Sequence, residues 1–448
     1  MRRSRLASRL QRMTALLLCV TLSLAGLATA AGAARPPAQA AAPSTFPPAI
    51  QRQFQQALDQ TLANPNVPAA RAGLQNALRA ELNNYLNTRR VPAHISAVEL
   101  RVTYPGTKPP MALAVGTTRY GGGPRLSTGA LWPIGSNTKA FTSVMLLQLE
   151  AEHKLSLSDT LGQWLPQYRA WRRIQIKQLL NMTSGIQDYE GAAFLHAYAA
   201  APNTAFSTSR LVSYVVGLPL QKGWNYSNTN YILAQMIIER VTHDTYADQL
   251  RKRIVTPLGL HNLFFSATRY PAAITARMPA GYLFYPGVPE FAPLMGKDLR
   301  GASVSWSQGA GGIVASLADL TTWVRALYTG RELPRQQQRE LESLVSVRTG
   351  KPIRKTSAAD PQGYGLGVGQ ATTSSTGTFW FYEGMTFGYR VLHLYSPRSG
   401  IVIAVAVNSS ISHANAETAC KPLQACFLMG FPLIRLGLSL YRLLHASR

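Results

Sequence analysis

Strand-like segments lie near both ends of this chain, and a long helix-rich segment separates them. Alternating apolar and polar residues predict a hairpin between His94 and Thr118. Residues between 155 and 325 have mostly helical periodicity, and strand-like runs return at 363–369, 378–382, 389–395 and 401–408. One sheet must therefore take its strands from two distant parts of the sequence. This order predicts an α/β lobe made of two segments, an inserted helical lobe, and a cleft where the lobes meet.

The composition is that of a folded protein with a basic excess. Its 448 residues are 46% hydrophobic, which is enough to bury a sizeable core and excludes wholesale disorder. Lysine and arginine total 45 against 20 acidic residues, a formal net charge of +25. The basic residues are dispersed, with short groups at 169–173 and 251–253, so we expect no nucleic-acid partner. An anionic cell-envelope surface is a more suitable partner for this charge.

The first thirty residues are typical of a secretory signal peptide. Five arginines between Arg2 and Arg12 precede an apolar run from Ala15 to Leu27, and small residues follow at 28–30 and again at 31–33. A membrane anchor is the weaker interpretation, because the apolar run is short and ends in small residues. We therefore predict a signal peptide over 1–30 and an exported protein, periplasmic or extracellular.

The rest of the chain divides into a spacer and one main domain. Residues 31–70 are an Ala/Pro-rich spacer followed by a helix, and residues 71–448 form the domain. Its α/β lobe is predicted over 71–155 and 320–448, and its helical lobe over 156–319. The last helical run, 431–445, is expected to cover the sheet, although its basic face also suits surface binding.

The cysteines and histidines predict no metal site. Cleavage of the signal peptide leaves Cys420 and Cys426, which an oxidising compartment would favour as a disulfide, with two free thiols as the alternative. The eight histidines form no metal-binding motif with each other or with cysteine. We expect neither a metal nor another cofactor.

Ser136 and Lys139 are candidate catalytic residues at the start of an apolar helix predicted over 140–150. A serine at a helix N-terminus lies near free backbone N–H groups, which can stabilise an oxyanion. A lysine three residues later lies over the same face, where a neutral amine could accept the serine proton. The serine could equally be a simple helix cap.

Tyr226 and Asn228 lie in a polar stretch before the helix predicted at 231–241. A phenol beside a lysine ammonium can be shifted toward phenolate and relay protons, and a carboxamide can hold a substrate amide. The triplet is weak alone, because a second Tyr-x-Asn occurs at 85–87 in a helical stretch.

The order of these motifs closely resembles the penicillin-recognising serine hydrolases, which include class C β-lactamases, D-Ala-D-Ala carboxypeptidases and related esterases and aminopeptidases. The resemblance spans roughly residues 74–408 and includes "WPIGSNTKAFTSV", "IQIKQLLNMTSGIQDY", "GWNYSNTNYILAQMIIERVT", "QGAGGIVASLADLTTWVRAL" and "YGLGVG". It implies a β-lactamase/transpeptidase-like α/β (α+β) fold. In that fold, terminal helices flank an antiparallel sheet and the active site lies where the helical lobe joins it.

The resemblance also implies catalytic roles for the candidate residues. Ser136 would be the nucleophile that forms an acyl-enzyme. Lys139 and Tyr226 would share general-base and general-acid work, and Asn228 would bind the substrate amide. The backbone N–H of Ser136 would supply half of the oxyanion hole.

The strand that completes the site departs from the family pattern. Where relatives have Lys or His, then Thr and Gly, this chain has Tyr382, Glu383 and Gly384, and Met385 would supply the second oxyanion N–H. Two like charges about 4 Å apart repel by roughly 1 to 4 kcal/mol, depending on solvent access. If Glu383 faces the cleft, substrates with a free carboxylate should bind poorly unless Arg390 compensates. Alternatively, Glu383 points away or pairs with an arginine, because a strand side chain has two faces.

Three functions remain open. The first is an exported serine hydrolase that acts through an acyl-enzyme on Ser136. Its small-molecule or peptide substrate would be an amide or ester, such as a D-Ala-type peptide, a β-lactam or a carboxylic ester. The second is a catalytically altered relative that binds cell-wall peptides or proteins. The third is an envelope surface protein that works through its spacer and C-terminal helix. No oligomeric state is predicted.

Overall fold

A computed structural model describes residues 68–106, 109–285, 289–374, 376–411 and 432–445. The predicted signal peptide, residues 31–67 of the segment predicted as spacer and helix, and the two cysteines predicted to pair lie outside these ranges. Within them, no helix is both long and apolar enough to cross a membrane.

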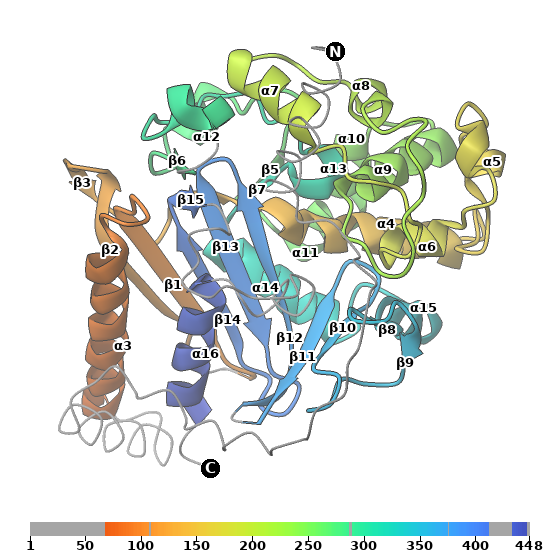
Figure 1. Ribbon diagram of the computed structural model, residues 1–448. Coiled ribbons are helices and arrows are strands. Elements are labelled where there is room, and N and C mark those ends of the chain that lie inside the picture. The colour runs from red at the N-terminus through yellow and green to blue at the C-terminus, as the bar shows by residue number, and fades with distance from the viewer. Residues whose placement is uncertain (1–67, 107–108, 286–288, 375, 412–431, 446–448) are drawn as a thin grey trace, which may run out of the picture.

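A ten-stranded antiparallel sheet is the main layer of the fold (Figure 1). Its N-terminal strands pair directly with its C-terminal ones: Val98 lies opposite Val407, so the two ends of the sequence meet in mid-sheet. The strand order is β3 (Gly122–Arg125), β2 (Met111–Arg119), β1 (Ala97–Thr103), β14 (Val402–Val407), β13 (Tyr389–Tyr395), β12 (Gly377–Thr386), β11 (Gly369–Thr373), β10 (Gln362–Tyr364), β8 (Leu344–Ser346) and β9 (Pro352–Ile353).

Helices cover both faces of this sheet. The terminal helices α3 (Pro68–Arg89) and α16 (Pro432–His445) pack on one face, where Gly437 of α16 lies against Leu392 of β13. Helix α14 (Leu317–Tyr328) covers the other face, where its Tyr328 stacks on Tyr395 of β13 (Figure 1). Leu392 and Tyr395 have opposite parity on one strand, so their side chains point to opposite faces. The prediction that the last helix covers the sheet is confirmed.

The helical lobe lies beside the sheet on the α14 side (Figure 1). Helix α4 (Thr138–Ala151) runs through its base and is buried along most of its length. Around it lie α5 (Leu161–Trp164), α6 (Ile176–Leu180), α7 (Ala192–Ala200), α8 (Thr208–Ser213), α9 (Asn228–Thr242), α10 (Tyr246–Leu250), a π-helical turn (Arg251–Val255), α11 (Thr256–Leu258), α12 (Ala272–Thr275), α13 (Gln308–Gly311) and α15 (Arg335–Leu341). An antiparallel sheet of β4 (Leu131–Pro133), β7 (Ile313–Ser316) and β5 (Leu263–Phe265) and a parallel pair, β6 (Tyr282–Phe284) with β15 (Ser409–Ile411), join the lobes.

Two local predictions were wrong. The strand predicted at 363–369 is two strands, β10 and β11, because Gly367 adopts φ +77° and the Gly365 N–H donates to the Val368 carbonyl, which closes a tight turn. The Gly-Ala-Gly-Gly run at 309–312 predicts a close-packed turn before the next helix, but it lies largely in the short helix α13, which packs against α4 and α9.

Candidate active site

Ser136 lies in a single 3-10 turn (Gly135–Asn137) that leads into α4 and packs against β12. Two glycines allow this approach. A Cβ at Gly384 would lie 2.8 Å from the Ser136 backbone nitrogen, and one at Gly135 would lie 2.6 Å from the Met385 nitrogen. The contact therefore brings together the two backbone N–H groups that the sequence predicted for an oxyanion hole.

Asn137 fixes this turn onto the sheet. Its Nδ2 donates to the carbonyls of Ile134 (2.7 Å) and Val391 (2.9 Å), and its Oδ1 lies 2.7 Å from His393 Nδ1. Burial lowers the pKa of His393 to about 3, so the imidazole is neutral and its Nδ1–H donates to Asn137. The residue next to the nucleophile thus has no free polar group on its side chain.

Lys139 is completely buried, and its amine contacts three oxygen atoms. Nζ lies 3.0 Å from Ser136 Oγ, 2.7 Å from Asn228 Oδ1 and 2.9 Å from the Ala310 carbonyl oxygen. Burial lowers its pKa to about 7, against the opposing effect of two nearby carboxylates. A neutral amine has two N–H groups, which the amide and carbonyl oxygens use, so its lone pair is left facing the serine hydroxyl.

Tyr226 approaches the same oxygen, since its hydroxyl donates to Ser136 Oγ at 2.6 Å. Burial raises the pKa of this phenol well above its ordinary value. The expected shift toward phenolate is therefore wrong, because desolvation is the largest influence on this phenol. Tyr226 enters the site as a protonated donor.

Two carboxylates that the sequence analysis missed complete this cluster. The Nδ2 of Asn228 donates to Asp188 Oδ2 at 3.0 Å and to Glu190 Oε1 at 2.8 Å. Burial raises the pKa of Asp188 to about 6 and that of Glu190 to about 8. Both Asn228 N–H groups and its oxygen are thus engaged by protein groups, and its role in binding a substrate amide stays a prediction. The signal was an Asp-x-Glu triplet at 188–190, which begins within the motif that ends at Tyr189.

Tyr382 is the first residue of the altered triad, and it faces the site as predicted from its position. Its hydroxyl lies 2.7 Å from that of Tyr364, which the sequence analysis also missed, and it neighbours Tyr226. Burial raises the pKa of Tyr382 and Tyr364 well above the ordinary value, so both phenols are neutral. Where relatives carry a Lys or His, this site offers an uncharged hydroxyl.

Glu383 does not line the cleft, so its assignment to substrate binding is wrong, and the alternative orientation, in which it points away, agrees with the structure. It lies opposite Leu392 in the β12–β13 register, and Leu392 packs on α16. Strand alternation therefore turns Glu383 to the outer face, near the backbone of Ile434 and in the field of Arg390. Burial raises its pKa to about 7. Glu383 cannot act as a charge gate at the substrate.

Comparison with known proteins agrees with this arrangement. The family model described as Beta-lactamase matches residues 102–420, more than half of the chain. The chain belongs to the β-lactamase family of serine hydrolases. It is 28% identical over 297 residues to the D-aminopeptidase of Gluconobacter oxydans, covering 64% of this chain and 51% of that protein. It is 26% identical over 235 residues to penicillin-binding protein 4* of Bacillus subtilis (strain 168), covering 51% of each.

A solved structure gives the same result. The D-stereospecific amidohydrolase from Streptomyces sp. superposes with a TM-score of 0.63 at 26% identity, over 74% of this chain and 94% of that one. The predicted family and fold are therefore confirmed. The chain spans only about half to three-fifths of the length of the first curated relatives it matches.

Proposed function

We propose that this protein is a serine amidohydrolase that cleaves amides of amino acids with a free amino group through an acyl-enzyme on Ser136. The observation that carries the proposal is the contact set of Lys139: two acceptors occupy its N–H groups and the serine hydroxyl faces its lone pair. With a pKa of about 7, the amine is about half neutral at neutral pH and suited to act as general base.

The reaction follows from this geometry. Lys139 takes the proton of Ser136 as Oγ attacks the substrate carbonyl, and the backbone N–H groups of Ser136 and Met385 hold the oxyanion. Collapse of the tetrahedral intermediate breaks the C–N bond while Tyr226 protonates the leaving nitrogen. The Lys139 ammonium then returns a proton to the Tyr226 phenol. In deacylation, a water molecule takes the place of the serine hydroxyl and attacks the acyl carbon. The proton that this water loses goes to Ser136 Oγ when the acyl–oxygen bond breaks.

The charges around the cleft support the substrate class. Asp188 and Glu190 are half-buried carboxyl groups with pKa values of about 6 and about 8, so Asp188 is mostly ionised at neutral pH. An ammonium bound beside Glu190 would favour its ionised form as well, so the pair is suited to hold the ammonium of an aminoacyl group. At Tyr382 the site has a neutral phenol, which gives a free substrate carboxylate no cation to pair with. A D-aminopeptidase and a D-stereospecific amidohydrolase among the relatives favour the D configuration.

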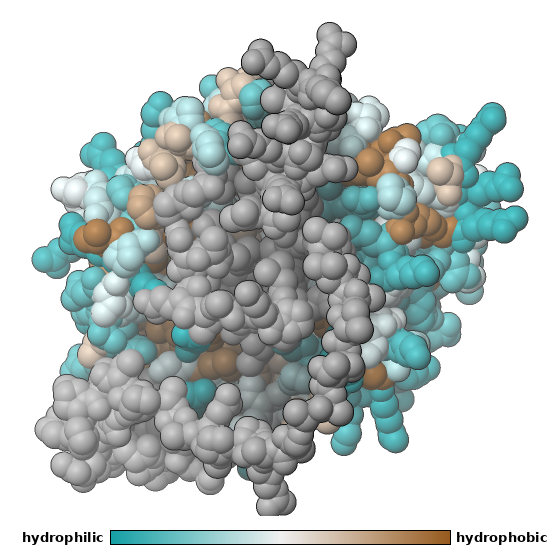
Figure 2. All heavy atoms as spheres, in the orientation of Figure 1, coloured by the Kyte–Doolittle hydropathy of each residue, from teal (hydrophilic) through white to brown (hydrophobic). Residues whose placement is uncertain are grey.

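An apolar loop beside the carboxylates favours a substrate with an apolar side chain. Val216, Leu218 and Leu220 are all exposed on the loop after α8, and Figure 2 shows apolar side chains gathered over the helical lobe. This loop is tied to the acidic segment, since Gln187 Nε2 donates to the Pro219 carbonyl at 2.9 Å.

The test compares D-phenylalanine amide with its L enantiomer and its N-acetyl derivative, on wild type and Ser136→Ala. We expect the serine variant to lose at least roughly 10³-fold in kcat, and N-acetylation to lower kcat/KM by about 10-fold or more. Ser213→Ala, at an exposed serine on α8, is the control and should match wild type. Equal rates on free and acetylated amides would refute the amine-binding proposal, and full activity of Ser136→Ala would refute the acyl-enzyme.

We also propose that the protein is exported. Support comes from the basic head, apolar run and small residues of the first thirty positions. N-terminal sequencing of the mature protein from its native host should begin at Ala31 or Ala34. An intact Met1 would contradict export by cleavage.

A further inference from the structure

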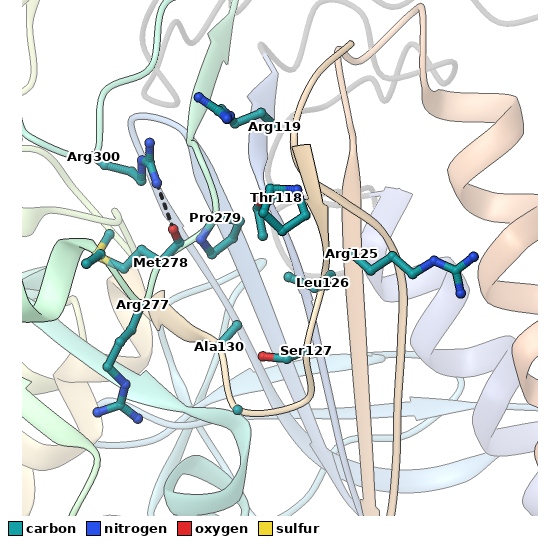
Figure 3. A pocket seen from close by; sticks show the side chains of 13 residues that line it. Thr118, Arg119, Arg125, Leu126, Ser127, Ala130, Arg277, Met278, Pro279 and Arg300 are labelled. Carbon is teal, nitrogen blue, oxygen red and sulfur yellow. Dashed lines mark hydrogen bonds between the residues drawn. The ribbon is translucent and has the colours of Figure 1, made fainter. Parts of the chain in front are cut away.

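An open pocket of about 550 Å³ lies at the edge of the α/β lobe, on the side of β2 and β3 (Figure 3). Its walls come from the end of β2, from β3 and the following loop, from the segment after α12, and from Arg300. Two backbone hydrogen bonds hold the walls together, from Ala280 to the Thr118 carbonyl (2.8 Å) and from Leu131 to the Arg277 carbonyl (3.0 Å). The pocket is thus built on tied segments of both lobes.

The lining is strongly basic. Its thirteen residues include four arginines, at positions 119, 125, 277 and 300, and none of the thirteen is acidic. Arg300 is held by an ion pair with Asp298 and by a 3.0 Å bond to the Met278 carbonyl. Arg277 is engaged by Asn262 at 2.6 Å. Among the described residues, no hydrogen bond or ion pair engages the side chains of Arg119 or Arg125.

The arginines differ in direction. Figure 3 shows Arg119 and Arg300 extending to the same side of the pocket, whereas Arg125 and Arg277 point outward at its rims. Two guanidinium groups on one side can engage a tetrahedral dianion through paired N–H groups, and the outer arginines add attraction at longer range. A single Asp298 offsets only part of this charge.

We propose that this pocket binds a phosphate ester, with the phosphate between Arg119 and Arg300. A pocket of this volume matches those that hold small organic ligands, so it exceeds the needs of a bare ion. The hydroxyls of Ser127 and Thr118 suit a polyol portion of the ligand, and Leu126 contributes apolar contact.

The pocket shares two of its lining residues with a neighbouring cavity. Met278 and Arg300 line a second, smaller cavity, which reaches Thr386 and Phe387 at the end of β12, next to Met385. The proposal does not depend on catalysis, because it concerns binding to a separate set of side chains.

Isothermal titration of the full chain carrying Ser136→Ala tests the proposal without turnover. The probes are glycerol 3-phosphate as a monoester, bis(glycerol) phosphate as a diester, and malonate as a dicarboxylate of similar charge. We expect saturable binding of at least one phosphate ester, tighter than malonate, and weakened about 10-fold by Arg119→Ala. The monoester and diester arms separate a small metabolite from a phosphodiester polymer.

Two further variants make the test decisive. Arg119→Ala with Arg300→Lys keeps the charge beside Asp298 and should weaken binding further than Arg119→Ala alone. Arg173→Ala removes an exposed arginine from the helical lobe and should leave binding unchanged. The proposal is overturned if neither ester binds, if malonate binds as tightly, or if Arg173→Ala weakens binding as much as Arg119→Ala.

Discussion

Two groups of carboxylates lie near the reaction centre, and only one of them reaches it. Asp188 and Glu190 bind the amide of Asn228, which in turn binds Lys139. Glu383 belongs to the strand that closes the oxyanion hole, yet its side chain lies on the opposite face of the sheet under α16. Burial raises the pKa of all three carboxyl groups. A position close to a catalytic motif in the sequence is therefore a poor guide to function unless the direction of the side chain is known.

The direction of each group follows from local backbone geometry. Successive side chains of β12 point to opposite faces of the sheet, so Glu383 must point away from the site that Tyr382 faces. In the acidic segment Tyr189 anchors the chain by donating its hydroxyl to the Trp306 carbonyl, and the residues on either side of it both contact Asn228. One buried phenol thus sets the position of two carboxylates.

Among these carboxyl groups, the largest expected effect comes from neutralising the acidic pair. Asp188→Asn with Glu190→Gln should lower kcat/KM for a free aminoacyl amide by roughly 10- to 100-fold, because a desolvated charge-assisted bond to the substrate ammonium is lost. Steady-state kinetics on D-phenylalanine amide measure this loss. Glu383→Gln is the matched control and should stay within about twofold of wild type. Equal losses in the two variants would mean that the acidic pair acts only on stability.

The sequence predicted the fold and the catalytic centre well because both depend on local signals. The apolar run of β14 is buried along its whole length, and the Ser136–Lys139 spacing corresponds to one helical turn. The acidic pair was missed because its contact with Lys139 passes through Asn228, a residue about forty positions away. Glu383 was misplaced because a triplet alone does not tell which strand face meets the nucleophile.

A smaller effect should appear in the pH profile. Lys139 acts as a base only when neutral, so kcat/KM for p-nitrophenyl acetate should rise with pH and reach half its plateau near pH 7. This ester carries no titrating amine that would distort the profile. The Asp188 carboxylate raises the pKa of Lys139, so Asp188→Asn should move the midpoint to lower pH. A midpoint that moves upward, or that moves equally in Glu383→Gln, would contradict this coupling.

The smallest effect on activity, and a distinct one on stability, is expected for Glu383. Its pKa is about 7 in the folded protein against 4.5 ordinarily, so the folded state binds more protons than the unfolded state between these values. This contribution to the free energy of unfolding is complete below about pH 4.5 and is lost as pH rises through 7. Urea unfolding at pH 5 and pH 8 should show that wild type loses on the order of 1 to 3 kcal/mol more than Glu383→Gln does. The field of Arg390 opposes the desolvation and limits the size of the effect. Identical pH dependence in the two proteins would show that this carboxyl is not buried under α16.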